Sequence, residues 1–383
     1  MKIVLSTPGK FHTFDLARQL HARGALQAIF TGYPRFKLRN EQLPEASIHT
    51  FPWIHAAYMA APQHMLGRTI KRQWEYLDRR TLDLHVSRRL PPCDVFVGLS
   101  GSALRSGKVA AERGAQYVCD RGSTHIRTQN RLLLEEHTLW GQPFHGIDPR
   151  IIELEEAEYA QAHCITVPSS FNVQSFVEQG VPPAKVKLVP YGVDLSRFRP
   201  TARPAEDRFA VLFAGGMSLR KGLPYLLQAY SLLRHSRKSL TLAGAVNDSF
   251  IRLMKQRRMW PDDVQVLGHV PQHKLKDLMS RSHVLVLPSI EEGLAMVQAQ
   301  AMACGCPVIA SENTGARDLF EDGKEGFIVP IRDPQTLTAR LEALAGDSTL
   351  RHRMSEASLA LVKSLRGWHD YGERAVAVYK GLC

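Results

Sequence analysis

The feature that most constrains the fold is an alternation of short apolar runs and amphipathic stretches along all 383 residues. The apolar runs span roughly four to eight residues and end in loops with glycine or proline, as buried strands do. The stretches between them carry apolar residues at helical spacing, for example Phe14, Leu16, Ala17 and Leu20. Because parallel strands need helical crossovers, the sequence predicts an α/β fold with helices on both faces of a parallel sheet.

The alternation stops once and then restarts, which predicts two domains. Strand candidates of the first half are residues 2–7, 25–32, 93–100, 115–120, 164–169 and 186–192. Those of the second half are residues 209–216, 240–244, 264–268, 283–289, 307–311 and 326–331. The break is RFRPTARPAEDR (197–208), which is rich in proline and charge. We expect one domain of residues 1–195 and a second domain of residues 196–365. Two doubly wound domains of this kind face each other across a cleft, which is the expected ligand site.

Composition excludes several classes of protein. Apolar residues make up 44% and charged residues 22% of the chain, as in an ordinary soluble protein. No apolar run approaches the roughly 18 residues that a membrane span needs, and the first residues lack a signal-peptide core. The six cysteines are scattered, which favours reduced thiols in a cytoplasmic protein.

The formal net charge of +12 leaves three interpretations open. The charge fits a plain basic surface, attraction to an anionic membrane or lipid phosphate, or nucleic-acid binding, although no nucleic-acid motif accompanies it and we expect no such partner. Residues 64–90 bear on this choice. Leu66, Ile70, Trp74 and Leu77 recur there at helical spacing among many arginines and lysines. This stripe predicts either a helix lying on an anionic membrane or one whose apolar side faces the core.

The stretch EEGLAMVQAQAMACG (291–305) follows a buried strand and predicts a ligand-binding loop. We expect the helix to begin at Leu294. Glycine at 293 allows close approach of a ligand, and free amides at Leu294, Ala295 and Met296 favour a phosphate or a sugar. Glu292 can accept hydrogen bonds from sugar hydroxyls, and Gln300 lies two turns along near the same face. A dipole-complementing acid and a structural amide are the alternatives for these two residues.

A second loop, AGGMSLRKG (214–222), joins a strand to a helix and carries two adjacent cations. Gly215 and Gly216 end the strand, and Arg220 and Lys221 would neutralise a diphosphate across from the first loop. A solvated basic turn is the alternative. The chain has neither a GxxxxGK[ST] phosphate loop nor a GxGxxG dinucleotide fingerprint.

Two further candidate stretches lie in the first half, each between the end of a predicted strand and the helix expected after it. Gly9 and Lys10 lie in the first strand-to-helix turn, which places them on the cleft edge. Asp120, Arg121 and His125 follow the strand that ends at Cys119 and are candidates for acceptor contacts. A tight turn and a structural salt link are the respective alternatives.

Assembled in order, the motifs of the second half resemble the retaining glycosyltransferases of family 4, which have the GT-B fold. The resemblance covers roughly residues 165–345. It rests on VPSSFNVQSFVEQGVPPAKVKLVPYGVDLSRFRP (167–200), LFAGGMSLRKGLPYLLQAY (212–230), the segment from VQVLG to PVIAS (264–311) and EDGKEGFIVP (321–330). The first half resembles the family only in pattern. The resemblance implies that residues 1–195, joined by a C-terminal helix of residues 366–383, form the acceptor-side domain and that residues 196–365 form the nucleotide-sugar donor-binding domain.

The resemblance implies roles for individual residues. Glu292 matches the first acid of the family's E-x7-E element, which contacts the donor sugar, and Gln300 stands where the second acid binds ribose. Lys221 matches the cation that holds the diphosphate. The family's arginine after the strand-end glycine is absent, and Arg220 is the substitute we expect. The segment that lies along the base is matched by Gly268, His269 and Val270. Asp120 falls near the position of the family's histidine beside the reacting sugar, with His125 as the substitute.

The expected activity is therefore transfer of a sugar from a uridine or guanosine diphosphate sugar to a glycan or lipid-linked acceptor, with retention of configuration. No Asp-x-Asp follows a strand, so we predict neither a metal nor another cofactor, and cations stabilise the leaving group instead. Two alternatives keep the fold: a phosphorylase or epimerase, and a non-enzymatic nucleotide-sugar binder. We expect the protein to act in cell-surface polysaccharide or glycolipid assembly, in the cytoplasm or on the inner membrane face.

Overall fold

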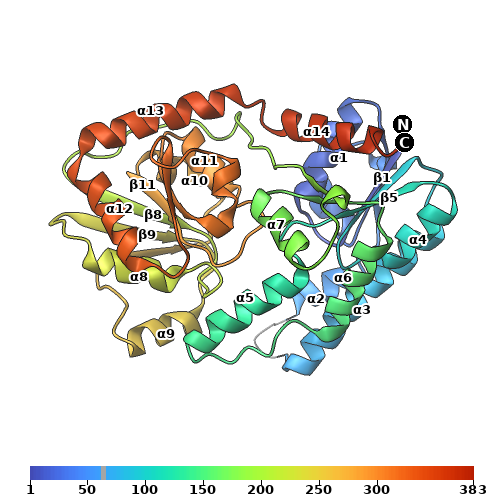
Figure 1. The fold of residues 1–383 in the computed structure, drawn as a ribbon, viewed down its shortest axis with the longest axis horizontal. Helices are drawn as coiled ribbons and strands as arrows, with labels where there is room; N and C mark the ends of the chain where they lie inside the picture. The colour runs from blue at the N-terminus through green and yellow to red at the C-terminus, as the bar shows by residue number, and fades with distance from the viewer. Residues whose placement is uncertain (62–65) are drawn as a thin grey trace.

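The computed structural model describes residues 1–61 and 66–383, and its chain forms two lobes, each built on a parallel sheet (Figure 1). The N-terminal sheet has the strand order β3-β2-β1-β4-β5-β6-β7 and the C-terminal sheet the order β10-β9-β8-β11-β12-β13. The α/β prediction, with two doubly wound domains, is thereby confirmed. The N-terminal strands are β1 (Ile3–Thr7), β2 (Leu26–Thr31), β3 (Ile48–Thr50), β4 (Val95–Leu99), β5 (Gln116–Asp120), β6 (Cys164–Val167) and β7 (Val186–Leu188). The C-terminal strands are β8 (Phe209–Ala214), β9 (Lys238–Ala243), β10 (Val264–Gly268), β11 (Val284–Leu287), β12 (Val308–Ser311) and β13 (Gly326–Val329).

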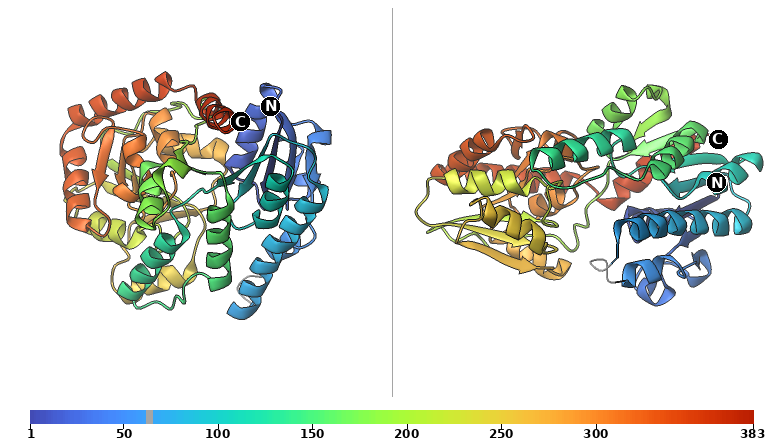
Figure 2. Two further views of the ribbon diagram at one scale, coloured as in Figure 1. Left: turned by 45° about the vertical axis from the view of Figure 1, so that its right-hand side comes forward. Right: turned by 90° about the horizontal axis from the view of Figure 1, so that it is seen from below.

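Helices cover both faces of each sheet (Figure 2). In the N-terminal half they are α1 (His12–Ala22), α2 (His55–Ala60), α3 (Arg68–Arg89), α4 (Leu104–Glu112), α5 (Ile126–Leu139), α6 (Pro149–Gln161) and α7 (Ser170–Glu178). They are followed by α8 (Leu223–Leu232), α9 (Asp248–Gln256), α10 (Gln272–Ser280), α11 (Val297–Ala303), α12 (Pro334–Gly346), α13 (Ser348–Ser364) and α14 (Trp368–Lys380). Short 3-10 turns include η4 (Glu312–Thr314) and η5 (Ala316–Asp318).

Strand order places the predicted loops together. In the N-terminal sheet the order reverses at β1, and in the C-terminal sheet it reverses at β8. Ligands of such sheets bind beyond the carboxyl ends of the strands at these switch points. The loops after β1, β8 and β11 contain Gly9, the Arg220–Lys221 pair and Glu292, respectively. All three loops therefore lie where an open α/β sheet places its ligand.

The apolar strands are buried because helices cover both faces of each sheet. Strands β1, β6, β11 and β12 are buried at every position, as expected for strands with helices on both faces. Strand β3 was not predicted. It is three residues long, and its middle residue, His49, is exposed, so it carries no apolar run.

Helix α5 belongs by sequence to the first half but packs under both lobes (Figure 1). Leu132 of this helix, and Trp140 directly after it, are part of the C-terminal hydrophobic core. The buried carboxylate of Glu136 accepts hydrogen bonds from Tyr225 (2.9 Å) and Arg332 (2.8 Å) of the other lobe. Helix α5 thus ties the two lobes together outside the connecting segments.

The end of the chain crosses back to the first lobe. Tyr371, Ala375 and Tyr379 of α14 lie in the N-terminal core, beside α1. This crossing touches the other connection between the lobes. A Cβ added at Gly192 would lie 2.5 Å from the carbonyl oxygen of Gly367, so the two backbones are in contact there.

The first residues of the apolar stripe predicted for residues 64–90 do not face the core. Residues 64 and 65 of this prediction lie outside the described residues. The buried apolar positions of α3 are Leu82 and Val86, near its end. Ile70 is 55% exposed and Leu77 43% exposed. The core-facing interpretation is therefore wrong for the first turns of α3. No helix among the described residues is long and apolar enough to cross a membrane.

Candidate functional site

The loop after β8 brings two cations against the loop after β11. Gly222 caps α8 with a φ of 64°, and a Cβ there would lie 1.8 Å from the carbonyl oxygen of Pro288. Only glycine allows this approach. The contact is continued by a hydrogen bond from the Ile290 amide to the Arg220 carbonyl (2.8 Å). Arg220 and Lys221 therefore lie directly beside Glu291 and Glu292.

Lys221 and Glu292 form an ion pair through Lys221 Nζ and Glu292 Oε1. The side chain of Lys221 is 26% exposed and that of Glu292 is 11% exposed, so solvent screens the pair only in part. The sequence assigned these residues to a diphosphate and to a donor sugar. Because those two groups are bonded to each other in a sugar nucleotide, one ligand could contact both members of the pair.

The helix after this loop begins later than predicted. Helix α11 starts at Val297, and the expected start at Leu294 is wrong. The Glu292 and Ala295 amides donate to the carbonyls of Asn313 and Thr314 (both 3.2 Å). Of the three amides predicted to be free, that of Ala295 is therefore engaged within the protein, and Gly293, Leu294 and Met296 lie in an irregular segment.

Contacts with the N-terminal lobe hold this loop in place. Ser169 Oγ donates to the Gly293 carbonyl (2.8 Å), and Asn172 Nδ2 donates to the Glu292 carbonyl (3.1 Å). A Cβ added at Gly293 would lie 2.1 Å from the carbonyl oxygen of Gly122. The loop that carries Glu292 therefore sits against the start of α7 and the loop after β5.

Arg220 is held by Glu291, a residue to which the sequence analysis assigned no role. Arg220 Nη2 lies 2.9 Å from Glu291 Oε2, and Nε donates to the Glu291 carbonyl (3.1 Å). Glu291 is fully buried. Burial alone would raise the pKa of its carboxyl group, but Arg220 and hydrogen bonds from Ser123, Thr124 and Gln129 hold that pKa below its ordinary value. The only sequence signal was its position beside Glu292.

Asp120 is buried at the end of β5 and has partners of its own. Its Oδ2 lies 2.6 Å from His12 Nε2, and its Oδ1 accepts from Thr166 Oγ1 (2.9 Å). His12 stacks on Tyr191 with ring centroids 4.3 Å apart. The sequence analysis missed His12, although this first residue of α1 stands two positions after Lys10. The His12–Asp120 pair lies near Gly122, since a Cβ there would be 3.5 Å from His12 Cε1.

His125 does not reach the cleft, so the structure gives no support to its predicted role there. Its side chain is buried and caps α5 by accepting from the Arg127 amide (3.2 Å). The ring packs against Tyr159 and Phe176. Burial lowers the pKa of His125 to about 4, so the ring is neutral near neutral pH. Arg121 is likewise internal and pairs with Glu155 (2.7 Å).

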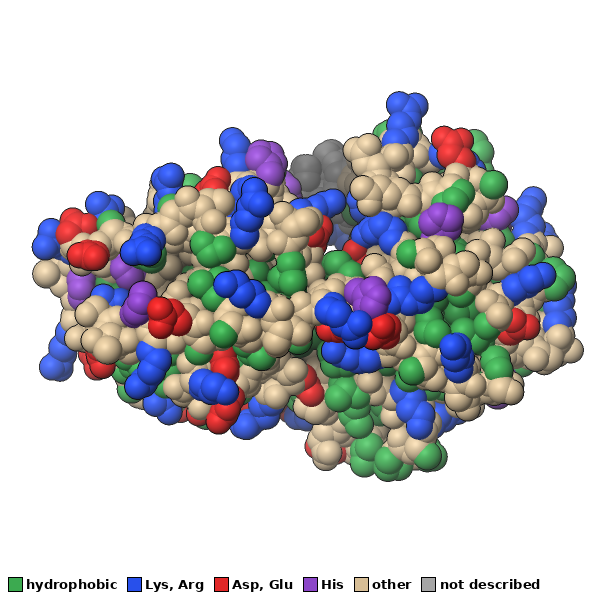
Figure 3. All heavy atoms as spheres, turned by 90° about the horizontal axis from the view of Figure 1, so that it is seen from above, with side chains coloured by type: hydrophobic (Ala, Val, Ile, Leu, Met, Phe, Trp, Pro, Cys, Tyr) green, Lys and Arg blue, Asp and Glu red, His purple; other side chains and the backbone are tan. Residues whose placement is uncertain are grey.

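A cavity of about 690 Å³ lies between the lobes and contains further predicted residues. Lys10 lines it from the N-terminal lobe, next to Gly9, and forms an ion pair with Glu41. Met296 and Gln300 line it from the C-terminal lobe. Figure 3 shows the hollow between the lobes from above, with lysine and arginine side chains spread over the visible face. Glu292 is not among the residues lining this cavity, so Gln300 and Glu292 contact different parts of the cleft.

The predicted base-binding segment lies farther away, at an edge of the sheet. Gly268 ends the edge strand β10 with a φ of 68°, and its carbonyl accepts from the Gly244 amide (2.8 Å). Gly244 in turn lies against Gly215, since a Cβ there would be 1.9 Å from the Gly215 carbonyl oxygen. His269 is exposed, and Val270 packs against the C-terminal core. Gly215 thus lies between this segment and the cations, while Gly216 has open space around it.

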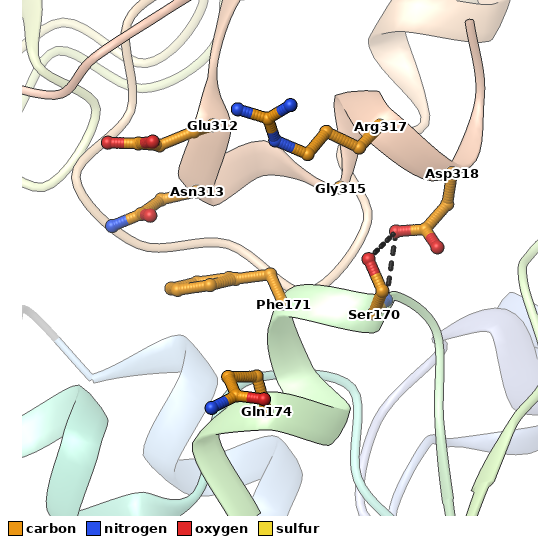
Figure 4. Close-up of a pocket in the computed structure, with 8 residues that line it drawn as sticks. All are labelled: Ser170, Phe171, Gln174, Glu312, Asn313, Gly315, Arg317 and Asp318. Carbon is orange, nitrogen blue, oxygen red and sulfur yellow. Dashed lines mark hydrogen bonds between the residues drawn. The ribbon is translucent and has the colours of Figure 1, made fainter. Parts of the chain in front are cut away.

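A smaller pocket of about 330 Å³ lies on the other side of the Glu292 loop (Figure 4). Phe171 and Gln174 of α7 form one wall, and Glu312, Asn313 and Arg317 of the η4–η5 segment form the other. Asp318 Oδ2 closes one end by accepting from the Ser170 amide (2.8 Å) and hydroxyl (2.9 Å). These bonds add to the hydrogen bonds that join the two lobes near the site.

Among the described residues, one cluster has donor atoms spaced for a metal ion: His369, Asp370 and Glu373. Arg366 already pairs with both carboxylates, at 2.8 Å and 2.5 Å. A guanidinium in this position disfavours a cation, so the cluster is not a promising metal centre.

Comparison with known proteins finds a family match for the C-terminal lobe. Residues 196–360 match a family model described as "Glycosyl transferases group 1". The chain is 22% identical over 274 residues to "Phosphatidylinositol N-acetylglucosaminyltransferase gpi3 subunit" of Schizosaccharomyces pombe, covering 70% of this chain and 59% of that one. It is 28% identical over 303 residues to "D-inositol 3-phosphate glycosyltransferase" of Thermomonospora curvata, covering 72% of this chain and 68% of that one. The chain thus spans less than two thirds of the length of the Schizosaccharomyces relative.

Solved structures match over the whole chain. Sucrose-phosphate synthase from Thermosynechococcus elongatus has a TM-score of 0.75 at 20% identity, covering 100% of this chain and 99% of that one. Anabaena Alr3699/HepE, solved in complex with UDP and glucose, has a TM-score of 0.73 at 16% identity, covering 100% of both chains. At these identities the likeness establishes the fold, which is the GT-B arrangement of two facing lobes.

Proposed function

We propose that this chain, whose residues 196–360 match the family model described as "Glycosyl transferases group 1", transfers a sugar from a nucleoside diphosphate sugar to a glycan or lipid-linked acceptor. The observation that carries the proposal is the pairing of Arg220 and Lys221 with Glu291 and Glu292 at the C-terminal switch point. A uridine or guanosine diphosphate donor and retention of configuration are the finer parts of the proposal. They rest on the resemblance of the second-half motifs, and the Anabaena structure contains UDP.

The geometry suits departure of a diphosphate. Negative charge develops on the leaving group as the glycosidic bond breaks, and preformed cations at that position stabilise the transition state. Lys221 is the first such cation, and a phosphate would compete with Glu292 for its ammonium group. Release from Lys221 would leave the Glu292 carboxylate free to accept hydrogen bonds from sugar hydroxyls. Gln300, at the large cavity, is then available to the ribose.

The N-terminal lobe supplies the opposite wall. In this proposal the His12–Asp120 pair lies beneath the contact between Gly122 and Gly293 and faces the reacting sugar. Its buried hydrogen bonds hold the two side chains in fixed orientations. Closure of the lobes excludes water, which limits hydrolysis of the donor.

The first test is a panel of uridine, guanosine and adenosine diphosphate sugars, read by thermal shift and then by transfer to lipid-linked and glycan acceptors. We expect one nucleotide class to raise the melting temperature and to support transfer. Glu292→Gln should lower turnover by roughly 10²-fold or more, the loss typical of a group that acts on the transition state. Stabilisation by none of these nucleotides would overturn the proposal.

The same panel separates the two alternatives that keep the fold. Binding of a sugar nucleotide without transfer, hydrolysis or isomerisation would indicate a non-enzymatic binder. The feature that favours a non-enzymatic binder is Gln300, which replaces the second carboxylate of the family's E-x7-E element. Release of a sugar phosphate in the presence of free phosphate, or isomerisation without an acceptor, would indicate a phosphorylase or an epimerase.

We also propose that the start of α3 and the neighbouring α2 rest on an anionic membrane, as on the cytoplasmic face of a cell membrane. An apolar groove of about 430 Å³ lies there, lined by Ile54, Ile70, Trp74 and Leu77 among others. Trp53 (76% exposed) and Met59 (59% exposed) add apolar surface nearby. Arg68 and Lys71 stand on the same turns and can attract acidic headgroups.

Vesicle sedimentation tests this surface. We expect binding to vesicles of phosphatidylglycerol and phosphatidylcholine at low salt, with loss of binding at high salt. The double variant Ile70→Ser/Leu77→Ser should reduce partition. Leu232→Ser, another exposed leucine on the C-terminal lobe, is the matched control and should leave it unchanged. Equal partition of all these proteins onto neutral vesicles at high salt would contradict the proposal.

A further inference from the structure

Glu291 is a carboxylate of the C-terminal lobe whose hydrogen-bond donors come mainly from the N-terminal lobe. Its Oε1 accepts from the hydroxyls of Ser123 and Thr124 and from the Thr124 amide (3.2 Å), with the Thr124 hydroxyl at 2.9 Å. Its Oε2 accepts from Gln129 Nε2 (3.1 Å). Most hydrogen bonds to the Glu291 carboxylate are therefore donated by the opposite lobe.

Arg121 holds the N-terminal donors of Glu291 in place. Arg121 Nε donates to the Thr124 carbonyl (3.0 Å), and its Nη2 donates to Gln129 Oε1 (2.9 Å). The same guanidinium pairs with the buried Glu155. Arg121 thus shapes the loop after β5 and the first turn of α5 into a preformed carboxylate receptor.

The remaining partner of Glu291 is a cation of the proposed diphosphate site. Arg220 uses Nη2 on the Glu291 carboxylate and Nε on the Glu291 carbonyl. Within the described part of the chain, Arg220 Nη1 has no hydrogen-bond partner. With its side chain 38% exposed, Arg220 is oriented by Glu291 while one edge of the guanidinium stays available.

We propose that Glu291 is a positioning residue that couples closure of the two lobes to presentation of Arg220 to the diphosphate. The inference rests on the proposed function for the identity of the ligand, and on the contacts above for the coupling. In the closed form the N-terminal lobe donates hydrogen bonds to Oε1 of Glu291. Arg220 then binds Oε2 of Glu291 through Nη2 and directs its own Nη1 to the ligand. When the lobes part, Oε1 loses its donors and both oxygens can attract Arg220 away from the ligand.

Electrostatics makes the two events depend on each other. Burial of a carboxylate without partners is strongly unfavourable, so the lobes close well only when Arg220 and the N-terminal donors are both in place. By linkage, a diphosphate that holds Arg220 in position favours closure to the same extent that closure favours the diphosphate. Loss of the Glu291 charge should therefore uncouple ligand binding from closure.

The test compares Glu291→Gln with the double variant Ser123→Ala/Thr124→Val, which removes N-terminal donors and leaves Arg220 untouched. Small-angle X-ray scattering of the full chain reads closure, with and without inorganic pyrophosphate. Calorimetry measures pyrophosphate affinity, and steady-state kinetics reads kcat and KM on the donor found by the nucleotide panel. Glu342→Gln on α12 is the control, because it removes the same charge from the same lobe and the exposed Glu342 carboxylate has no ion pair or hydrogen bond within the described residues.

We expect both test variants to show a larger radius of gyration and little compaction by pyrophosphate. Their pyrophosphate affinity and their kcat should each fall by about 10- to 100-fold, because closure favours diphosphate binding and also presents Arg220 to the leaving group. Glu342→Gln should match the parent protein. Unchanged compaction and kcat in both test variants would overturn the inference. If the parent chain turns over no sugar nucleotide yet pyrophosphate compacts it and not the variants, the proposed function fails and the coupling stands.

Discussion

The ion pair between Lys221 and Glu292 predicts a specific stability signature for Lys221→Met. Methionine keeps the apolar stem of lysine and removes the charge that neutralises Glu292. Breaking a fully buried pair costs about 3–5 kcal/mol, and a fully exposed pair is worth about 0–1 kcal/mol. Because the two side chains are 26% and 11% exposed, we place the loss of unfolding free energy at roughly 1–3 kcal/mol.

A double-mutant cycle isolates the pair from other effects of the substitution. Urea unfolding would be measured for the parent chain, Lys221→Met, Glu292→Gln and the double variant. The neutral glutamine removes the unpaired charge, so the double variant should be more stable than the sum of the single losses predicts. Lys108→Met is the control, since Lys108 and Glu112 are both exposed and 3.9 Å apart, and its cost should stay below about 0.5 kcal/mol. Strict additivity of Lys221→Met and Glu292→Gln would refute the reasoning.

Two further predictions concern the loop after β8 and the capping residue of α5. Gly222→Ala should cost clearly more stability in urea than Gly24→Ala. Both residues have positive φ (64° and 66°), but only at Gly222 does an added Cβ meet backbone; equal costs would contradict the close contact with Pro288. His125→Asn keeps a capping acceptor and removes a titrating ring. The folded pKa of His125 is about 4, below its ordinary value near 6.5, so its contribution is fully present above pH 6.5 and is lost as pH falls toward 4. Between pH 7 and pH 5 the parent should lose roughly 2 kcal/mol more than the variant, and parallel stability profiles would contradict this.

The fold could be predicted because both faces of the strands are buried. That burial produces near-continuous apolar runs, which are visible without knowledge of any partner strand. Strand β3 escaped because three residues with an exposed histidine leave no such run. The position of the loops after β1, β8 and β11 followed from the same pattern, since parallel strands place their ends at one edge.

The finer geometry of the site depends on contacts between lobes, which local sequence does not encode. The helix start at Val297 is an example, because Ser169 and Asn172 hold the preceding loop from the other lobe. The spacing to Gln300 singled out Glu292, but the sequence indicated no role for Glu291, because its hydrogen-bond donors Ser123, Thr124 and Gln129 belong to the other lobe. His125 was assigned to the cleft by its place after a strand, whereas the capping geometry turns its ring inward. His12 was overlooked because its partner, Asp120, is 108 residues away.

The contact between Gly192 and Gly367 restricts how the lobes can move. Both connecting segments pass through this point with backbone against backbone, and a Cβ on Gly367 would lie 2.3 Å from the carbonyl oxygen of Val193. We therefore expect the lobes to rotate about this point rather than slide, because sliding would pull the two contacting segments apart. A side chain introduced at either glycine would act as a wedge at that pivot and fix a minimum opening angle. Such a wedged molecule would offer a way to capture the open form.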